Sequence, residues 1–248
     1  GTNMQMAGFT NYIRMFQDDV FIQSIKNTFF YFILQVPIML VVAMVLACIL
    51  NKKDLRFKGF FRTMIFLPCT TSLVAYAIIF RSLFANDGLV NYVLVNFGIL
   101  DKPYNFLTQP FAAKMVIILA LLWRWTGYNM VFFLSGLQNI ESSVYEAAKI
   151  DGASAIQTFF KITVPLLKPT ILLTAIMSTN GTLQLFDESI NLTAGGPANA
   201  SISMSHYIYN LCFKYVPNFG YAAATSFFIL LLVAVLAFIQ MRVGDKRD

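Results

Sequence analysis

Long apolar runs separated by short polar connections form the dominant pattern of this chain. A helix needs about 20 apolar residues to cross the hydrocarbon core of a bilayer. Runs of about that length predict membrane-spanning helices at residues 27–50, 63–83, 112–137, 165–186 and 219–241. The expected fold class is therefore all-α, a polytopic transmembrane helical bundle with five spans in this chain.

The segments outside these runs predict further local structure. Residues 1–22 mix polar and aromatic side chains, which indicates an extramembrane segment with an interfacial helix. Residues 89–100 are apolar but too short to cross, which favours an interfacial or re-entrant helix. Pro37 predicts a kink in the first span, and Pro68 in the second is followed by hydroxyl side chains that can bind the freed backbone.

Basic residues predict the orientation, because cytoplasmic connections carry an excess of Lys and Arg. They are dense between the first and second spans, and recur between the third and fourth spans and in the tail. Those at the opposite ends of the spans are spread over longer segments that also hold acidic residues. The cytoplasmic set is Lys52, Lys53, Arg56, Lys58, Arg62, Lys149, Lys161, Lys168, Arg242, Lys246 and Arg247. Residues 138–164 and the C-terminus are thus expected in the cytoplasm and the N-terminus outside. An outside start without a signal peptide is unusual for a complete polytopic protein, so a sixth membrane helix is expected to precede the chain.

Composition excludes several classes of function. Only 12% of residues are charged and 58% are hydrophobic, whereas soluble domains carry about 25% charged residues. The net charge of +6 could suggest nucleic acid or anionic lipid as a partner, but the basic residues form no basic stripe, so membrane topology explains the charge better; membrane lipid surrounds the spans, and no nucleic acid is expected. Three cysteines and one histidine lack the clustering that a metal site or a membrane-embedded enzyme requires. An ion-coupled secondary transporter would need carboxylates near mid-bilayer, and the pattern places none there.

Residues 138–164 form a polar connection long enough to build structure outside the bilayer. Ser143 with Glu146 fits a capping box, and Ser154 with Gln157 repeats it. Gly152 lies between them, where a left-handed C-cap belongs. Pro165 and Pro169 suit the first turn of the next helix. The pattern predicts a bent pair of short helices that presents small side chains as a docking surface.

The string Tyr145-Glu-Ala-Ala-Lys-Ile-Asp-Gly-Ala153, with Ile162 and Pro165 after it, resembles the "EAA" loop of the membrane subunits of binding-protein-dependent ABC importers. The residues of this motif resemble those of the sugar-importer branch, of the maltose-permease type. Residues 192–197 (Leu-Thr-Ala-Gly-Gly-Pro) resemble the outer loop of that family, and Gly220-Tyr221-Ala-Ala-Ala fits the start of its last span. The resemblance extends over the chain from Phe9 onward.

This resemblance implies a type I ABC importer permease fold, with residues 1–248 as a single permease domain in a bacterial-type cell membrane. It implies no catalytic residue and no cofactor in this chain, since ATP and Mg would bind to separate nucleotide-binding subunits. It further implies a second permease subunit of different sequence, an extracellular solute-binding protein and a carbohydrate substrate, an oligosaccharide in particular. An importer of a non-sugar solute is the alternative. The implied contacts with the ATPase subunit are Glu146, Ala147, Ala148, Asp151, Gly152 and Ala153.

Arg124 is the costliest side chain in the predicted spans, at about 2.5–3.5 kcal/mol for a central arginine. One interpretation is that Arg124, Trp123 and Trp125 line the translocation path, where indole faces pack against sugar rings. The other is a structural arginine paired with backbone carbonyls. Both remain open at this stage.

Asn180 and Gln184 share a helix face, while Thr182 points away. These groups fit either a path or hydrogen bonds between helices. The resemblance places sugar contacts near Arg124, Gly127, Met130, Ser178, Gly181, Thr182 and Leu185. Several of these differ in type from the contacts of that family, so the partner could hold the sugar site or the path could be non-specific. The candidate path residues are Trp123, Arg124, Gly127, Asn129, Ser178, Asn180, Thr182 and Gln184.

Overall fold

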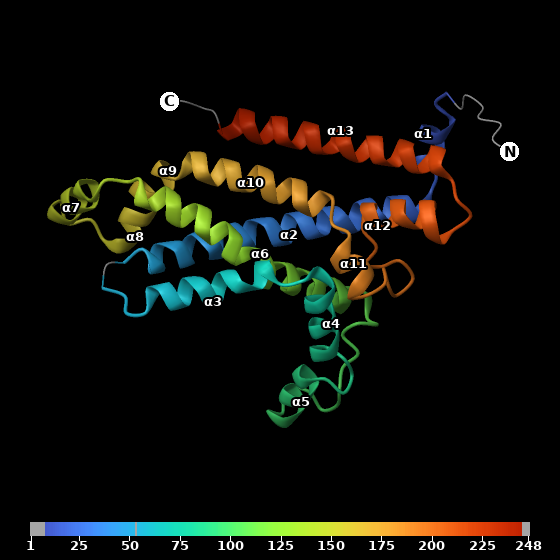
Figure 1. Cartoon of the computed structure of the whole chain (residues 1–248), viewed down its shortest axis with the longest axis horizontal. Coiled ribbons are helices and arrows are strands. Elements are labelled where there is room, and N and C mark those ends of the chain that lie inside the picture. Colours follow the sequence, from blue (N-terminus) through green and yellow to red (C-terminus); the bar gives the residue numbers. More distant parts are fainter. Residues whose placement is uncertain (1–7, 53, 245–248) are drawn as a thin grey trace. The chain divides into compact units, whose positions relative to one another are not determined.

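A computed structural model describes residues 8–52 and 54–244, and every regular element among them is a helix (Figure 1). The chain divides into two compact units. The first unit comprises Gly1–Leu34, Ser72–Ala120 and Asn180–Leu236. The second unit comprises Gln35–Thr71, Leu121–Thr179 and Ala237–Asp248. The long helices contribute one part to each unit.

The helices follow one another with short connections. In chain order they are α1 (Thr10–Met15), α2 (Asp19–Leu50), α3 (Lys58–Thr70), α4 (Leu73–Leu83), α5 (Leu89–Asn96), α6 (Pro110–Gln138), α7 (Ser142–Ile150), α8 (Ala155–Thr158), the π-helical turn η1 (Phe159–Thr163), α9 (Val164–Leu166), α10 (Lys168–Leu183), α11 (Asp187–Asn191), α12 (Met204–Tyr209), the π-helical turn η2 (Asn210–Lys214) and α13 (Phe219–Gly244).

Of the described helices, α2, α6 and α13 are each long and apolar enough to cross a membrane. Two bent pairs also qualify when each is taken as one span: α3 with α4, and Ala155–Leu166 with α10. Together they correspond to the five predicted spans. The short helix expected within residues 89–100 is α5, and the interfacial helix expected near the N-terminus is α1.

The first span begins earlier than its apolar run. The run predicts a start at residue 27, whereas α2 starts at Asp19. The Asp18 carboxylate accepts hydrogen bonds from the backbone N–H groups of Val20 and Phe21, at 3.0 and 3.1 Å. This is N-cap geometry, which begins the helix in a polar segment.

Asp18 also anchors the core of the first unit. Its carboxylate accepts hydrogen bonds from the hydroxyls of Tyr207 and Tyr221. Burial by itself raises the pKa of Asp18, but the hydrogen bonds from Tyr207, Phe21, Tyr221 and Val20 outweigh it and hold that pKa below its ordinary value. The apolar side chains packed here are Met15, Phe21, Ile202, Tyr207, Leu211, Tyr221 and Ala222.

The segment after α10, which lies outside the predicted spans, is held by many hydrogen bonds. It contains α11, and its turns are closed by hydroxyl groups: the Ser189 hydroxyl donates to the carbonyl of Ser201 at 3.0 Å. Asn27 and Tyr31 of α2 also bind this segment through the carbonyls of Ile202 and Ser201, at 2.9 and 3.0 Å. The sequence prediction missed this order because the hydrogen bonds join residues far apart in the chain.

The second unit packs α2 against α6 through a separate core, made of Ala43, Met44, Ala47, Leu50, Met130, Phe133, Leu134, Leu137 and Leu167. α3 crosses α6 at Gly127. A Cβ atom there would lie 1.9 Å from the carbonyl oxygen of Ile65. The two backbones therefore touch, and only glycine fits at this crossing.

Candidate functional site

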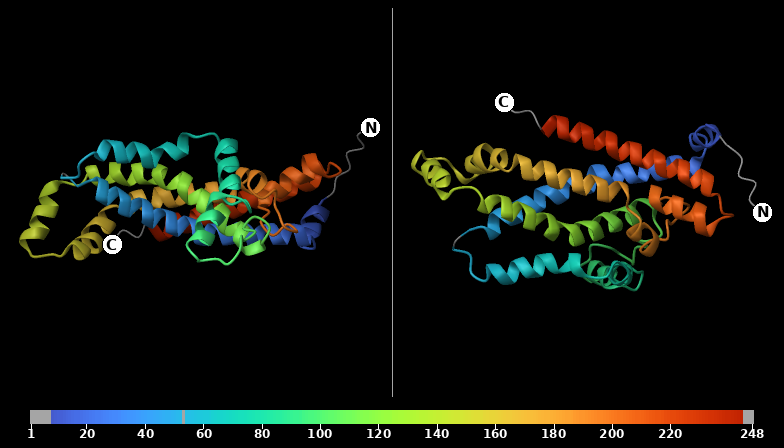
Figure 2. Two further views of the ribbon diagram at one scale, coloured as in Figure 1. Left: turned by 90° about the horizontal axis from the view of Figure 1, so that it is seen from below. Right: turned by 45° about the horizontal axis from the view of Figure 1, so that its top comes forward.

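The polar segment predicted at residues 138–164 folds as an elbow between the end of α6 and the start of α10. One arm is α7, and the other is the continuous helix Ala155–Leu166 (Figures 1 and 2). Glu146, Ala147 and Asp151 are exposed on it, whereas Ala148 is buried. The elbow therefore presents a carboxylate surface with small side chains, as the sequence predicts.

The arms are joined by a Schellman turn. Gly152 has φ of +75°, its N–H donates to the carbonyl of Lys149 at 3.2 Å, and the N–H of Ala153 donates to the carbonyl of Ala148 at 2.9 Å. These two bonds define the motif and confirm the predicted left-handed C-cap. No atom lies within 4 Å of the position of a Cβ on Gly152. The demand for glycine is thus set by backbone conformation and not by space.

Of the two predicted capping boxes, one is confirmed. The N–H of Gln157 donates to the Ser154 hydroxyl at 3.2 Å, and the N–H of Ser154 donates to the Gln157 side chain at 2.9 Å. The box at Ser143 and Glu146 is wrong. The N-cap of α7 is Glu141, so Ser143 lies inside the first turn, and its hydroxyl donates to the Glu141 carboxylate at 3.2 Å.

The second arm contains the π-helical turn η1, directly before Pro165. Proline has no N–H and cannot continue the regular ladder, and π-helical turns frequently lie at functional positions. The chain then bends by 70° before α10 begins at Lys168. Pro165 lies in the first turn of α9 and Pro169 in the first turn of α10, so both prolines are at the start of a helix, as predicted.

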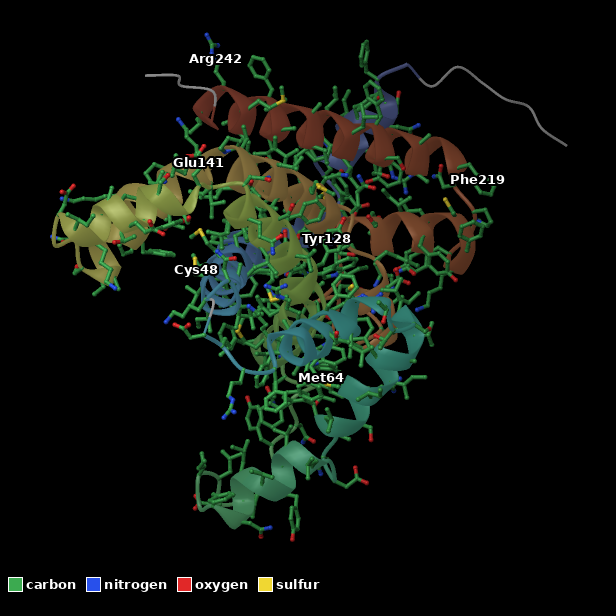
Figure 3. The ribbon with its side chains drawn as sticks, turned by 60° about the vertical axis from the view of Figure 1, so that its left-hand side comes forward. Cys48, Met64, Tyr128, Glu141, Phe219 and Arg242 are labelled. Atoms are coloured by element: carbon green, nitrogen blue, oxygen red, sulfur yellow. The ribbon has the colours of Figure 1, made fainter. Side chains whose placement is uncertain are left out.

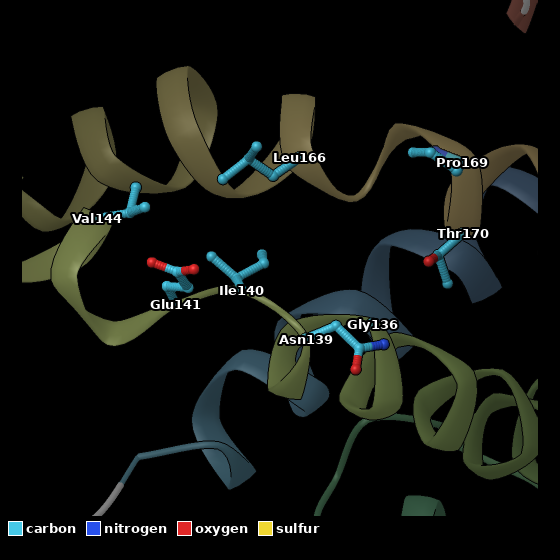
Figure 4. A pocket seen from close by; sticks show the side chains of 8 residues that line it. All are labelled: Gly136, Asn139, Ile140, Glu141, Val144, Leu166, Pro169 and Thr170. Atoms are coloured by element: carbon cyan, nitrogen blue, oxygen red, sulfur yellow. The ribbon is translucent and has the colours of Figure 1, made fainter.

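A pocket of about 360 Å³ opens between the elbow and α10 (Figure 4). Glu141, labelled in Figures 3 and 4, brings a carboxylate to its wall. Below the pocket α6 and α10 touch, since a Cβ on Gly136 would lie 2.8 Å from the Thr170 hydroxyl oxygen. The start of α7 and the first turn of α10 thus both line this pocket. The lining residues are Gly136, Asn139, Ile140, Glu141, Val144, Leu166, Pro169 and Thr170.

Arg124 is buried in the second unit, and its guanidinium binds the end of α3. It donates to the carbonyls of Thr71, Cys69 and Pro68 at 2.8, 3.3 and 3.4 Å, and to the Thr71 hydroxyl at 3.2 Å. The end of a helix carries partial negative charge, so the arginine acts as a C-cap. Of the two interpretations of Arg124, this geometry agrees with the arginine paired with backbone carbonyls. Its neighbour Trp123 is exposed.

The remaining candidates in the second unit form a small polar group. The Ser178 hydroxyl donates to the side-chain oxygen of Asn129 at 3.3 Å, and the amide nitrogen of Asn129 donates to the carbonyl of Trp125 at 3.1 Å. Gly127 and Met130 have packing roles, at the α3–α6 crossing and in the core.

In the first unit, Asn180 and Gln184 lie on one exposed face, as predicted. The Gln184 amide donates to the Asn180 side-chain oxygen at 2.6 Å. Thr182 and Leu185 are buried, and a Cβ on Gly181 would meet no atom within 4 Å.

Two polar residues of the first unit were missed by sequence reasoning. Glu188 is buried and accepts a hydrogen bond from the hydroxyl of Tyr76, which links α11 to α4. His206 is buried, and its Nδ1 lies 2.9 Å from the Ser189 hydroxyl. Burial, with the charge of Lys214, lowers the pKa of His206 to about 4. For Glu188, the signal available in the sequence was the acidic pair Asp187-Glu188 directly after an apolar run, because such a pair can begin a helix as well as a loop.

Comparison with known proteins places this architecture in a defined group. Residues 20–247 match the family described as "Binding-protein-dependent transport system inner membrane component". The lactose transport system permease protein LacF of Rhizobium radiobacter is 53% identical over 249 residues, which cover 100% of this chain and 84% of the relative.

Two solved structures share the fold. A bacterial ABC transporter involved in the import of the acidic polysaccharide alginate has a chain with a TM-score of 0.88 and 25% identity, over 98% of this chain and 85% of that one. A bacterial alginate ABC transporter in complex with an alginate pentasaccharide-bound periplasmic protein has a chain with a TM-score of 0.85 and 27% identity, over 96% of this chain and 83% of that one. The fold is thus that of a type I ABC importer permease, as the sequence predicts.

Proposed function

Because the chain belongs to the family of inner membrane components of binding-protein-dependent transport systems, we propose that it is a permease subunit that moves a carbohydrate into the cell, an oligosaccharide in particular. The similar proteins named for lactose and alginate support this substrate class. The single observation that supports the coupling role is the elbow at residues 138–164. Its exposed residues Glu146, Ala147 and Asp151 directly precede a Schellman turn.

The chain works as one permease domain, residues 1–248, within a larger assembly. ATP and Mg bind to separate ATPase subunits, so this chain carries neither catalytic residues nor a cofactor. A second permease of different sequence completes the pathway, and an extracellular solute-binding protein delivers the sugar. The alginate transporter solved with its periplasmic protein supports the last of these partners.

The elbow converts the movement of the ATPase subunits into movement of the spans. Glu146, Ala147, Ala148, Asp151, Gly152 and Ala153 form the contact surface, on the cytoplasmic side. The exposed members meet the ATPase, while buried Ala148 anchors α7 to the rest of the elbow. Because Ile140, Phe159 and Val164 of the elbow pack against the core of the second unit, a push on the elbow can rock the spans between inward- and outward-facing states.

Candidate path residues fall into two roles. Exposed Trp123 offers an indole face to a sugar ring, and exposed Asn180 and Gln184 offer amides to hydroxyls. The other candidates support the helices of their own unit: Arg124, Gly127, Asn129 and Ser178 in the second unit, where Arg124 closes the end of α3, and buried Thr182 in the first unit.

The Gly152→Pro substitution tests the coupling role. Proline holds φ near −65° and removes the N–H that binds Lys149, so the Schellman turn cannot form. In proteoliposomes that contain the assembled transporter and sugar-loaded binding protein, we expect normal insertion and assembly, ATP hydrolysis that no longer depends on the binding protein, and loss of sugar uptake.

The matched control is Gly152→Asn, because asparagine tolerates a left-handed backbone. We expect it to keep most of the coupling. Sugar uptake still driven by ATP in the proline variant would contradict the role of the elbow.

A further inference from the structure

The N-cap residue and the first turns of α3 carry an exposed apolar stripe. Its members recur at positions i, i+3, i+4, i+7 and i+10, which places them on one face of the helix. The exposed fractions range from 77% at Phe57 to 43% at Phe61. The stripe, which we call the α3 stripe, comprises Phe57, Phe60, Phe61, Met64 and Leu67; Met64 is labelled in Figure 3.

Cations gather at one end of the α3 stripe. Lys52 and Arg56 are exposed in the connection from α2, and Lys58 is half-buried at the first position of α3. Asp54 is the one acidic residue among the described residues of this connection. Arg62 is used differently, because its guanidinium donates to the carbonyl of Leu50 at 3.0 Å and braces α3 against the end of α2.

Phe57 itself has an unusual conformation. Its φ of 56° is left-handed, which is a costly region for a bulky side chain. The ring gains no compensating burial within the chain, since it is 77% exposed. An apolar environment supplied from outside would offset that cost.

We propose that this surface binds an anionic phospholipid. The phosphate lies among Lys52, Arg56 and Lys58, and an acyl chain lies along Phe60, Met64 and Leu67. Juxtamembrane basic residues attract anionic lipid headgroups, and charge complementarity at one end with an apolar stripe at the other matches a single amphiphilic occupant. The inference uses only the membrane placement of the family, and its failure would leave the proposed transport function intact.

The experiment uses the assembled transporter in nanodiscs, with the native cysteines replaced and a small fluorophore attached through Met64→Cys. Brominated phosphatidylglycerol and brominated phosphatidylcholine are compared as quenchers, since bromine quenches only a fluorophore that it approaches closely. We expect phosphatidylglycerol to be preferred. The Arg56→Gln, Lys58→Gln double variant should lower this preference by about fivefold for each cation removed, since each is worth about 1 kcal/mol near an anionic surface.

The control removes two exposed cations elsewhere, Lys102→Gln with Lys214→Gln, and should leave the preference unchanged. Three outcomes would overturn the proposal. Equal quenching by the two lipids would show no headgroup selection. Equal losses in both double variants would show a general charge effect. No quenching by either lipid would show that a protein partner, such as the second permease, covers the α3 stripe.

Discussion

At the scale of single residues, the most informative side chain is Arg124. A helix that ends inside an apolar environment leaves its last carbonyls without partners. Arg124 supplies several donors to the end of α3, and the Thr70 and Thr71 hydroxyls bind the carbonyls of Leu67 and Pro68 at 2.8 and 2.7 Å. The hydroxyl groups that follow Pro68 therefore bind the last carbonyls of α3, and the arginine completes this cap.

Replacement of Arg124 should destabilise the fold. Arg124→Gln leaves buried carbonyls unpaired, and we expect the free energy of unfolding to fall by about 2–4 kcal/mol, as measured by denaturant unfolding of the purified transporter in detergent. The free energy of unfolding of Arg124→Lys should lie between those of the parent protein and Arg124→Gln, because an ammonium group cannot reach as many of these acceptors as a guanidinium.

The control is Arg81→Gln, at an exposed arginine of α4, which should be near neutral. An Arg124→Gln variant with full stability but no transport would instead assign the guanidinium to the sugar.

His206 predicts a pH dependence of stability. Its pKa in the folded state is about 4, below the ordinary value of 6.5, so the unfolded chain binds the proton more tightly. Its contribution to stability is therefore complete above pH 6.5 and is lost as the pH falls from 6.5 to about 4. We expect the melting temperature to fall across this window.

His206→Asn should reduce the fall of the melting temperature between pH 6.5 and about 4, since asparagine keeps a donor toward Ser189 and does not titrate. The chain has one histidine, and both proteins share the same carboxylates. Identical slopes in parent and variant would contradict the assignment.

At the scale of elements, the helix crossings depend on glycine at particular positions. A Cβ on Gly127 would overlap the carbonyl of Ile65, whereas one on Gly181 would meet nothing within 4 Å. We expect Gly127→Ala to lower the free energy of unfolding by about 1–3 kcal/mol through overpacking. Gly181→Ala should be neutral, or stabilising by up to about 1 kcal/mol, because alanine is the better helix former. Denaturant unfolding of both variants measures the contrast, and equal effects would contradict the close crossing of α3 and α6.

Sequence reasoning succeeded where an element depends on its own residues. Gly152 and the Ser154–Gln157 box were predictable because the hydrogen bonds that define them join residues at most five apart along the chain. The break between α3 and α4 was not predictable. Pro68 indicated a disturbance, but the 99° bend follows a helix end that is capped by Arg124, which lies 53 residues from Thr71 in the chain. Ser143 fits the capping-box pattern, but Glu141 takes the N-cap position.

At the scale of the whole molecule, the arrangement of charge predicts sidedness. Basic residues concentrate in the connection 51–62, in the elbow and in the tail, which should all be cytoplasmic. Single-cysteine variants at Lys149 and Lys102, both exposed, test this with a membrane-impermeant maleimide. In intact cells, stripped of any outer membrane, we expect the Lys102→Cys protein to be labelled and the Lys149→Cys protein to be labelled only after permeabilisation. The reverse pattern would place the elbow outside and remove it from the reach of a cytoplasmic ATPase.

The sequence alone was enough for the all-helical class, the short helix at residues 89–100, the turn at Gly152 and the family, because hydrophobic length, turn chemistry and a contiguous motif are local properties. Tertiary structure decided the partners of Arg124, the crossing at Gly127, and the burial of Glu188 and His206. Each of these depends on hydrogen bonds or backbone contact between residues distant in the chain, and a linear pattern does not specify which distant groups meet.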